Sequence, residues 1–198
     1  MNLGFLASHR GSNMQALVDA ARDGRLHATP RVVISNNGDA EALVRARREG
    51  LPAYHLSGKT HPDPERLDEA IRDTLASHDV DLVILAGYLK KLGPKTLARY
   101  RGRVINVHPA LLPKYGGTGM YGDRVHEAVL ASGDQETGIT VHVVDEEYDH
   151  GPIVAQCRVP VLERDTIVSL SQRVLEREHR FLVEVVDQIA TGTLALPR

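Results

Sequence analysis

The chain has 198 residues, of which 42% are hydrophobic and 25% charged, and its formal net charge is -2. This composition is typical of one soluble globular domain, which we place at residues 1–198. A charge so close to zero gives no general attraction to nucleic acid or to a membrane surface, and the single cysteine excludes an internal disulfide. Residues 1–7 lack the basic start of a signal peptide, and no apolar run approaches the roughly 20 residues of a membrane span, so we expect a cytoplasmic protein.

The first predicted unit is a strand, a turn and a helix. Residues 3–7 form an apolar run, Gly11, Ser12 and Asn13 form a turn, and residues 14–22 have the apolar spacing of a helix. The free N–H groups at such a helix start favour a phosphate monoester, because the turn lacks both the dinucleotide glycine pattern and the nucleoside triphosphate lysine motif. The alternative is that Ser12 or Asn13 only caps the helix, and the turn taken alone favours this alternative.

Strands and helices continue to alternate along the chain. The further predicted strands cover residues 31–34, 52–56, 81–87, 103–107, 137–144 and 152–159. The further predicted helices cover residues 40–50, 65–78, 94–100, 125–132 and 167–189. The short loop between the last two strands indicates an antiparallel pair. We therefore predict an α/β fold, with a Rossmann-like, mostly parallel sheet of seven strands, helices on both faces and an antiparallel edge.

The strand predicted at residues 103–107 ends in two polar side chains. Asn106 and His108 are two residues apart, so they point to the same side of the strand, and Pro109 ends the ladder directly after them. A carboxamide and an imidazole at the carboxyl end of a buried strand can both donate hydrogen bonds to an oxygen that becomes negative. A polar strand end followed by a turn explains this short motif equally well.

Two unusual loops follow this strand. Residues 114–122 contain four glycines in nine residues, which predicts a mobile or finely shaped loop. Residues 145–151 are rich in acids and join the last two strands. A carboxylate of this loop beside His108 would raise the proton affinity of the imidazole and let the pair move a proton. The alternative is an acidic loop that is simply solvated.

Four motifs occur in one order along the chain, and together they are specific. They are Gly11-Ser12-Asn13, Leu85-Ala86-Gly87-Tyr88, Asn106-Val107-His108-Pro109 continued by Leu111-Leu112-Pro113, and Tyr148-Asp149 followed by Gly151-Pro152. In this order they resemble the glycinamide ribonucleotide formyltransferases of the folate-dependent formyltransferase superfamily, from residue 1 to the final helix. The resemblance implies transfer of the formyl group of 10-formyltetrahydrofolate to the amine of glycinamide ribonucleotide, through a tetrahedral intermediate, in de novo purine biosynthesis.

The resemblance also implies roles for individual residues of this chain. The catalytic residues would be Asn106, His108 and Asp149. The acceptor's phosphate would be held by Gly11, Ser12 and Asn13, and the rest of the acceptor by Gly87, Pro109 and Glu178. The folate would contact Tyr88, Leu89, Lys90, Leu92, Asp145, Glu146, Glu147 and Tyr148.

The partners implied are small molecules alone, namely glycinamide ribonucleotide and a reduced folate, bound by a monomer or a homodimer. The reaction requires no metal, and the spacing of His142, His150 and His179 matches no tight ligand cluster, so we expect these histidines to be exposed or packed. No nucleic-acid or membrane partner is expected.

The chain departs from the family pattern at three places. The glycine-rich segment is longer than usual, and His108 and Asp149 are 149 - 108 = 41 residues apart. The basic residue often found before the third helix is not obvious, and Lys59 and Arg66 are the available substitutes. On the last helix Leu175 stands where a polar or basic residue is frequent, and Arg173 is the candidate compensating contact.

Several other functions remain open at this point. Within the superfamily they are a formyltetrahydrofolate hydrolase and a formyltransferase for another phosphorylated or sugar-nucleotide amine. A transfer-RNA formyltransferase is disfavoured because the chain is not basic and shows no second, nucleic-acid-binding domain. A nicotinamide oxidoreductase is disfavoured because the glycine fingerprint is missing. Outside enzymes, the same fold is compatible with a phosphometabolite sensor, although Asn106, His108 and Asp149 occurring together argues against one.

Overall fold

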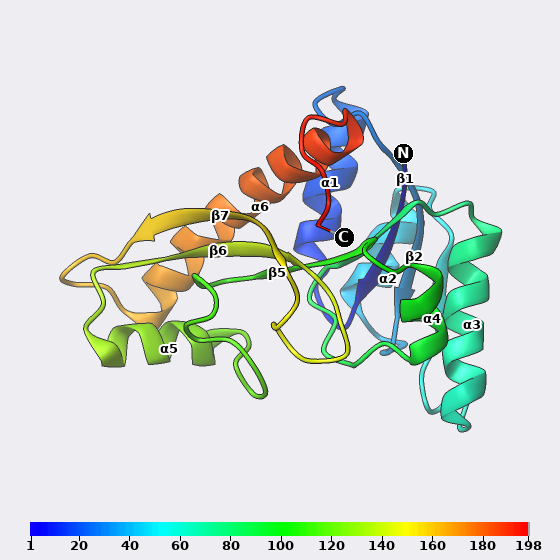
Figure 1. Ribbon diagram of the computed structural model, residues 1–198, viewed down its shortest axis with the longest axis horizontal. Coiled ribbons are helices and arrows are strands. Elements are labelled where there is room, and N and C mark those ends of the chain that lie inside the picture. Colours follow the sequence, from blue (N-terminus) through cyan, green and yellow to red (C-terminus); the bar gives the residue numbers. More distant parts are fainter. Residues whose placement is uncertain (198) are drawn as a thin grey trace.

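The computed structural model describes residues 1–197, which contain one seven-stranded sheet with the strand order β3-β2-β1-β4-β5-β6-β7 (Figure 1). The strands are β1 (Asn2–Ala7), β2 (Thr29–Ser35), β3 (Ala53–His55), β4 (Leu82–Leu85), β5 (Val104–His108), β6 (Glu136–Val143) and β7 (Ile153–Pro160). The helices are α1 (Ser12–Arg22), α2 (Glu41–Arg48), α3 (Pro64–Ser77), α4 (Pro94–Arg99), α5 (Asp123–Ser132) and α6 (Ile167–Ala190). Every predicted strand and helix is present, with ends that differ from the prediction by at most two residues.

The sheet is parallel from β3 to β5 and antiparallel from β5 to β7. The chain runs from β1 outward to β2 and β3, and then returns to the other side of β1 with β4. In open α/β sheets, ligands bind outside the carboxyl ends of the strands at such a reversal. The predicted Rossmann-like sheet with an antiparallel edge is therefore confirmed, and its crevice lies at the ends of β1, β4 and β5.

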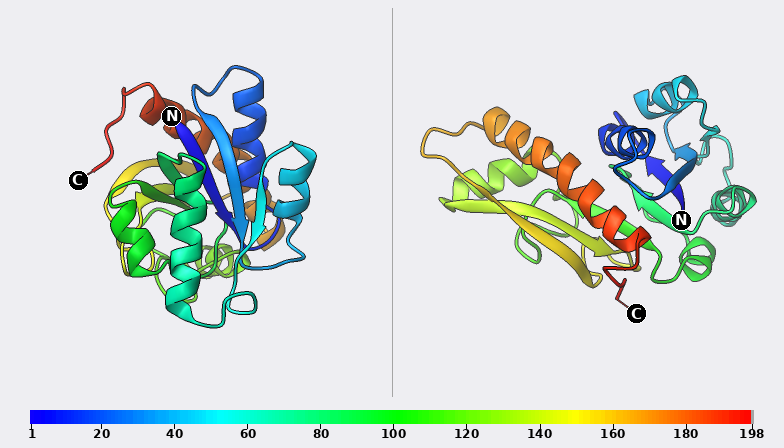
Figure 2. Two further views of the ribbon diagram at one scale, coloured as in Figure 1. Left: turned by 90° about the vertical axis from the view of Figure 1, so that its right-hand side faces the viewer. Right: turned by 90° about the horizontal axis from the view of Figure 1, so that it is seen from above.

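Helices cover both faces of the sheet and enclose a separate apolar core on each face (Figure 2). One core joins β1 to α1 and α6 through Phe5, Leu17 and Leu182, and the other packs Leu75 of α3 and Tyr100, which follows α4, under the opposite face. Helix α6 runs along β6 and β7 and also contacts α1 and α5. The last helix of the chain, α6, thus packs directly against the first helix, α1.

The two longest helices have side-chain caps at their starts. Asp63 accepts a hydrogen bond of 2.8 Å from the N–H of Glu65 at the start of α3, where Pro64 occupies the first turn. Thr166 and Ser169 form a reciprocal capping box at the start of α6. Within residues 1–197, no helix is both long enough and apolar enough to cross a membrane.

Candidate active site

A cavity of about 940 Å³ opens at the carboxyl ends of the central strands. Its wall is built from the loops after β1 and β4, the end of β5, the glycine-rich segment before α5, and the first half of α6. From the predicted site it contains Asn13, Gly87, Tyr88, Leu89, Lys90, Asn106, His108, Pro109, Tyr148, Asp149 and Glu178. The structure therefore brings together residues from both ends of the chain.

Asn106, His108 and Asp149 lie in contact at the floor of this cavity. Asn106 Nδ2 lies 3.4 Å from Asp149 Oδ1, and His108 Nδ1 lies 3.5 Å from Asp149 Oδ2. Asn106 and His108 come from β5, and Asp149 comes from the acidic loop between β6 and β7. The loop carboxylate that the sequence placed beside His108 is Asp149.

Both ring nitrogens of His108 face hydrogen-bond acceptors. Nε2 donates to the backbone oxygen of Tyr115 at 2.7 Å, and Nδ1 faces Asp149. Burial lowers the pKa of His108, and the Asp149 carboxylate and the Tyr115 carbonyl oppose this effect without reversing it. His108 is therefore a buried imidazole. If it takes up a proton, the Tyr115 oxygen and the Asp149 carboxylate can accept hydrogen bonds from its two N–H groups.

Asp149 is held in its ionised form. Burial raises the pKa of this carboxyl, but its interactions with His142 and His108 and the N–H of Gly117 outweigh burial, so the pKa lies below the usual value. The Gly117 N–H donates to Asp149 Oδ2 at 3.0 Å. Asp149 has a φ of 55°, a left-handed conformation that aspartate adopts more readily than most residues.

His142 belongs to this cluster, and the sequence analysis placed it only as an exposed or packed histidine. It is 2% exposed, and its Nε2 lies 3.1 Å from Asn106 Nδ2 and 3.4 Å from Asp149 Oδ1. Its Nδ1 lies 3.0 Å from the oxygen of Val143, so in the neutral ring Nε2 accepts from Asn106. The antiparallel register sets Asn106 against His142 and His108 against Thr140, and the matching two-residue spacing in β6 was the available signal.

A second missed histidine, His126 of α5, also lines the cavity. It is 5% exposed, and its Nδ1 has no hydrogen-bond partner among the described residues. Burial lowers its pKa, Asp123 opposes this shift and His108 adds to it. The cavity therefore holds a neutral imidazole opposite the catalytic candidates.

The turn before α1 corrects one interpretation of the sequence. Gly11 occupies the N-cap position with a φ of 67°, and neither Ser12 nor Asn13 caps the helix, so the capping alternative is wrong. Only glycine fits here, because a Cβ on Gly11 would lie 2.7 Å from the Cβ of Ala42. Asn13 lines the cavity beside Arg10, a cation that the sequence analysis missed. Of the three predicted phosphate-binding residues, Asn13 lines the cavity, and Gly11 and Ser12 do not.

The α6 wall of the cavity corrects the expectation for Arg173. Its guanidinium donates two hydrogen bonds of 2.6 Å to Asp165 and one of 3.0 Å to the oxygen of Pro160, so it is committed outside the cavity. Leu175 and the 73% exposed Val168 line the wall instead. Neither Lys59 nor Arg66 lines the cavity, and the guanidinium of Arg66 lies 3.5 Å from Glu69.

Glu178 supplies a carboxyl group to that wall, which also carries Ser171 and Gln172. It is 7% exposed, and burial raises its pKa to about 7, although the hydrogen bond from Asn13 acts in the opposite direction. Asn13 Nδ2 donates to Glu178 Oε1 at 2.6 Å. The cavity end between α1 and α6 therefore contains a buried carboxyl group that can hold a proton near neutral pH.

A smaller hollow of about 50 Å³ adjoins the main cavity between the loops after β4 and β6. Its lining includes the predicted folate residues Tyr88, Lys90, Leu92, Asp145, Glu146, Glu147 and Tyr148, while Leu89 faces only the main cavity. Lys91 Nζ donates to the oxygen of Glu146 at 2.9 Å and lies 5.1 Å from the centre of the Tyr148 ring, so it ties the two loops together. Asn106 and Asp149 line both hollows.

The described chain shows no arrangement for a metal. Among residues 1–197, no three or more histidine, cysteine, aspartate or glutamate side chains are grouped so that they could hold an ion. The histidines around Asp149 belong to a hydrogen-bonded cluster in which His142 and His108 face the same carboxylate.

Comparison with known proteins identifies the family. Residues 1–186 match the family model described as formyl transferase. The chain belongs to this family. It is 39% identical over 194 residues to the phosphoribosylglycinamide formyltransferase of Haemophilus influenzae, covering 98% of this chain and 89% of that protein. Formyl transferase membership, as predicted from the order of the motifs, is confirmed.

Two further relatives support the formyl transferase assignment. The chloroplastic phosphoribosylglycinamide formyltransferase of Vigna unguiculata is 41% identical over 188 residues, which are 94% of this chain but 60% of that longer protein. The crystal structure of glycinamide ribonucleotide transformylase 1 from Symbiobacterium toebii superposes with a TM-score of 0.91 at 38% identity, covering 100% of this chain and 91% of that one. The predicted formyltransferase fold is confirmed.

Proposed function

We propose that this chain is a phosphoribosylglycinamide formyltransferase, which transfers the formyl group of 10-formyltetrahydrofolate to the amine of glycinamide ribonucleotide. The observation that carries the proposal is the place of Asn106 and Asp149, which line both hollows at the point where the hollows meet. A reaction between two substrates needs its polar groups at such a junction, because both reactants must reach them at once.

The main cavity is the proposed acceptor site. The N–H groups at the start of α1, shaped by Gly11, Ser12 and Asn13, face the phosphate, and Arg10 supplies positive charge beside them. Glu178 contacts the glycinamide portion, with Gly87 and Pro109 on the opposite wall. Among the described residues, α6 contributes no cation to the cavity lining, so phosphate binding is assigned to the α1 side, where Arg10 lies.

The smaller hollow is the proposed pterin site. Its lining is formed by the backbone turns at residues 88–92 and 144–149, whose peptide groups can satisfy a polar heterocycle. The hydrogen bond from Lys91 to the oxygen of Glu146 joins the two loops that form this lining. Leu89, which lines the main cavity next to Tyr88 and Lys90, lies where the rest of the folate leaves toward solvent.

The chemistry follows from the three polar side chains at the junction. The acceptor amine attacks the formyl carbon, a carbon–nitrogen bond forms, and the formyl oxygen becomes negative. Asn106 donates an N–H to this oxygen, and His108, once it has taken up the proton of the attacking amine beside Asp149, places its positive charge near it. Asp149, through His108 or a water molecule, assists transfer of the amine proton to the departing folate nitrogen as the second carbon–nitrogen bond breaks.

The test is a formyl-transfer assay with purified protein and 10-formyltetrahydrofolate, with and without glycinamide ribonucleotide, that follows release of tetrahydrofolate. Turnover that depends on the ribonucleotide is the expected result. Turnover without the acceptor would replace the proposal by a hydrolase. Folate binding with no turnover in either mixture would contradict this acceptor and direct the search to other phosphorylated or sugar-nucleotide amines.

A further inference from the structure

A polar cluster outside the cavity holds the phenol of Tyr115. The Tyr115 hydroxyl donates to Asp134 Oδ2 at 2.7 Å and lies 2.5 Å from Ser132 Oγ. Lys114 Nζ reaches the same oxygen of Asp134 at 2.5 Å and lies 5.2 Å from the centre of the Tyr115 ring. We call these four residues, Lys114, Tyr115, Ser132 and Asp134, the Tyr115 anchor.

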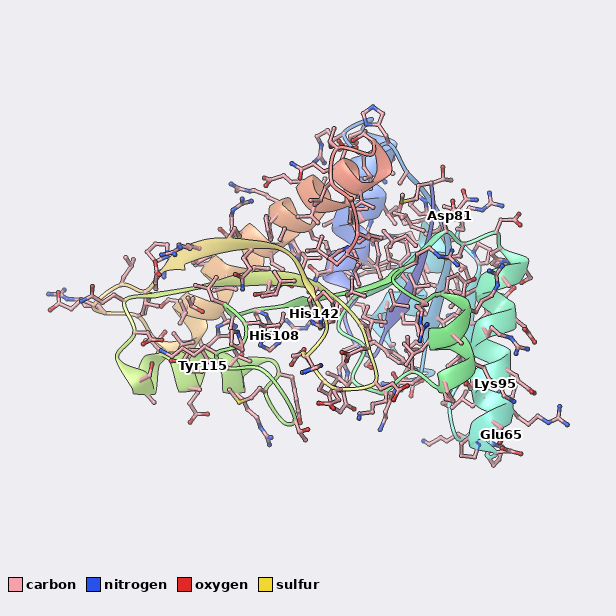
Figure 3. The ribbon with its side chains drawn as sticks, viewed as in Figure 1. Glu65, Asp81, Lys95, His108, Tyr115 and His142 are labelled. Atoms are coloured by element: carbon pink, nitrogen blue, oxygen red, sulfur yellow. The ribbon has the colours of Figure 1, made fainter. Side chains whose placement is uncertain are left out.

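The backbone of Tyr115 faces the other way, toward the catalytic candidates. Its carbonyl oxygen accepts the hydrogen bond of 2.7 Å from His108 Nε2, and Figure 3 shows His108 between Tyr115 and His142 in this view. Tyr115 has a φ of 59°, a left-handed conformation that a tyrosine does not favour by itself. Surrounding contacts must therefore maintain it. The anchor holds its side chain, and two residues later Gly117 is bonded to Asp149.

The Tyr115 carbonyl determines which nitrogen of His108 carries hydrogen. The Tyr115 oxygen and the Asp149 carboxylate both only accept, but Nε2 lies 2.7 Å from the Tyr115 oxygen whereas Nδ1 lies 3.5 Å from Asp149 Oδ2. The shorter contact favours Nε2 as the protonated nitrogen of the neutral ring and leaves Nδ1 facing Asp149. A proton that His108 gains during the reaction must then enter at Nδ1, next to the carboxylate. If the ring turned or changed tautomer, this relation between His108 and Asp149 would be lost.

We propose that Tyr115, held in place by Asp134, is a positioning residue that fixes the orientation and tautomer of His108. This inference rests on the proposed function, in which His108 is catalytic. Asp134 does not touch His108 and acts through the Tyr115 side chain and backbone. Remote support of this kind matters because a displacement of about 1 Å at a catalytic group can cost on the order of 100-fold in rate.

Three charged or titratable groups surround His108, and the substitutions that test this inference leave all three unchanged. Asp149 faces the ring from the acidic loop, His142 from β6, and His126 from α5. None of these three belongs to the Tyr115 anchor. A change in the behaviour of His108 on disrupting the anchor is therefore carried by the segment that the anchor holds, through the Tyr115 carbonyl and the Gly117 N–H that donates to Asp149.

The central experiment compares Tyr115→Phe, Asp134→Ala and the double variant with the unmodified chain. We expect each single variant to lower kcat by about 10-fold, with KM for both substrates within about 2-fold, and the double variant to lose no more than either single one. Asp134→Asn keeps an oxygen that can accept from the phenol, so it should retain more activity than Asp134→Ala. Tyr54→Phe removes an exposed hydroxyl on β3 and is the matched control, expected to leave kcat unchanged.

A spectroscopic readout separates this inference from the proposed function. Nitrogen-15 NMR of the histidine side chains should show His108 as the Nε2–H tautomer in the unmodified chain and as a mixture in Tyr115→Phe. An unchanged tautomer and an unchanged kcat profile against pH in Tyr115→Phe would overturn the inference, as would additive losses in the double variant. If the unmodified chain transfers no formyl group, the proposed function fails, and the tautomer measurement still decides whether the anchor positions His108.

Discussion

Asn13 at the start of α1 and Glu178 in the middle of α6 are joined by a hydrogen bond of 2.6 Å, although they lie 165 residues apart in the sequence. Both side chains are buried, and Asn13 Oδ1 has no hydrogen-bond partner among the described residues. The bond joins the two helices that flank the wide end of the cavity. It also places a carboxyl group where its ionisation is costly.

Replacing Glu178 by glutamine should remove a pH-dependent part of the stability. The pKa of Glu178 is raised from 4.5 to about 7 in the folded protein, so the folded state holds the proton more tightly than the unfolded chain. Its stabilising contribution is complete below about pH 4.5 and is lost as the pH rises through 7. Relative to Glu178→Gln, the unmodified chain should lose up to about 3 kcal/mol of unfolding free energy over this window.

Urea unfolding at a series of pH values from 4.5 to 8 measures this difference. Glu176→Gln, an exposed change two residues away on the same helix, is the control and should follow the unmodified chain. Parallel stability curves for Glu178→Gln and the unmodified chain would show that Glu178 ionises without penalty.

Replacing Gly11 by alanine should damage both stability and acceptor binding. Gly11 and Gly24 both have left-handed backbones, with φ values of 67° and 73°, but a Cβ at Gly11 meets Ala42 at 2.7 Å, whereas a Cβ at Gly24 meets nothing within 4 Å. Both substitutions should cost about 1–2 kcal/mol for the backbone conformation. Gly11→Ala should cost at least about 1 kcal/mol more for the collision, and should raise KM for the phosphorylated acceptor.

Thermal unfolding and acceptor kinetics of the two glycine variants check this expectation. Because Gly24→Ala carries the backbone cost alone, the difference between the variants isolates the contact with Ala42. Equal stabilities and equal KM values would mean that the α1 turn has room to adjust and does not define the phosphate site.

Replacing His108 by alanine or Asp149 by asparagine should lower turnover far more than it weakens binding. Removal of a group that moves a proton typically costs about 10²–10⁴ in rate. Asparagine is suited to position 149 because it tolerates the φ of 55° and keeps an oxygen for the Gly117 N–H. Steady-state kinetics and calorimetric titration with a non-reactive folate give the two quantities.

Asp73→Asn, an exposed change on α3, is the control for loss of a carboxylate and should be fully active. Near-normal kcat in either His108→Ala or Asp149→Asn would mean that the residue has been given the wrong role. A loss confined to folate affinity would move it from the chemistry to the binding site.

Replacing His142 by leucine should lower kcat by about 10-fold while folate affinity changes little, because the Asn106 amide loses the nearer of its two acceptors and keeps only Asp149 Oδ1 at 3.4 Å. His142→Gln restores a side-chain oxygen at a similar distance and should recover part of the activity. Kinetics of the two variants provide the check. Equal activity of leucine and glutamine at this position would show that the hydrogen bond from Asn106 has no part in orienting the amide.

The sequence predicted the fold in detail because each element carries its own signal. The apolar alternation at residues 137–144 and the short loop after it were enough to predict the antiparallel pair of β6 and β7. Asn106 and His108 could be placed together because two-residue spacing in one strand fixes their side. Both features depend on residues that are close together in the sequence, so the spacing of residue types was enough to predict them.

What the sequence did not predict depends on contacts between distant segments. His142 reaches the site through the pairing of β5 with β6. Arg173 does not reach the site, because both terminal nitrogens of its guanidinium donate to Asp165, eight residues away in the sequence. The alternative that Ser12 or Asn13 caps α1 could not be rejected from the sequence, because the left-handed conformation of Gly11 cannot be recognised from a Gly-Ser-Asn run alone. The sequence shows which residue types are present, but their hydrogen-bond partners depend on how distant segments pack in the folded sheet.

The connection between β5 and β6 has two parts that differ in what they contribute to the structure: the residues up to Gly117, and the residues between Gly117 and α5. The register of the two strands is fixed by their own ladder, so the length of the connection does not move Asn106, His108 or His142. Up to Gly117, however, the connection contributes the carbonyl that holds His108 and the N–H that holds Asp149. An insertion between Gly117 and α5 should therefore leave both contacts in place, whereas an insertion before Gly117 should disturb them.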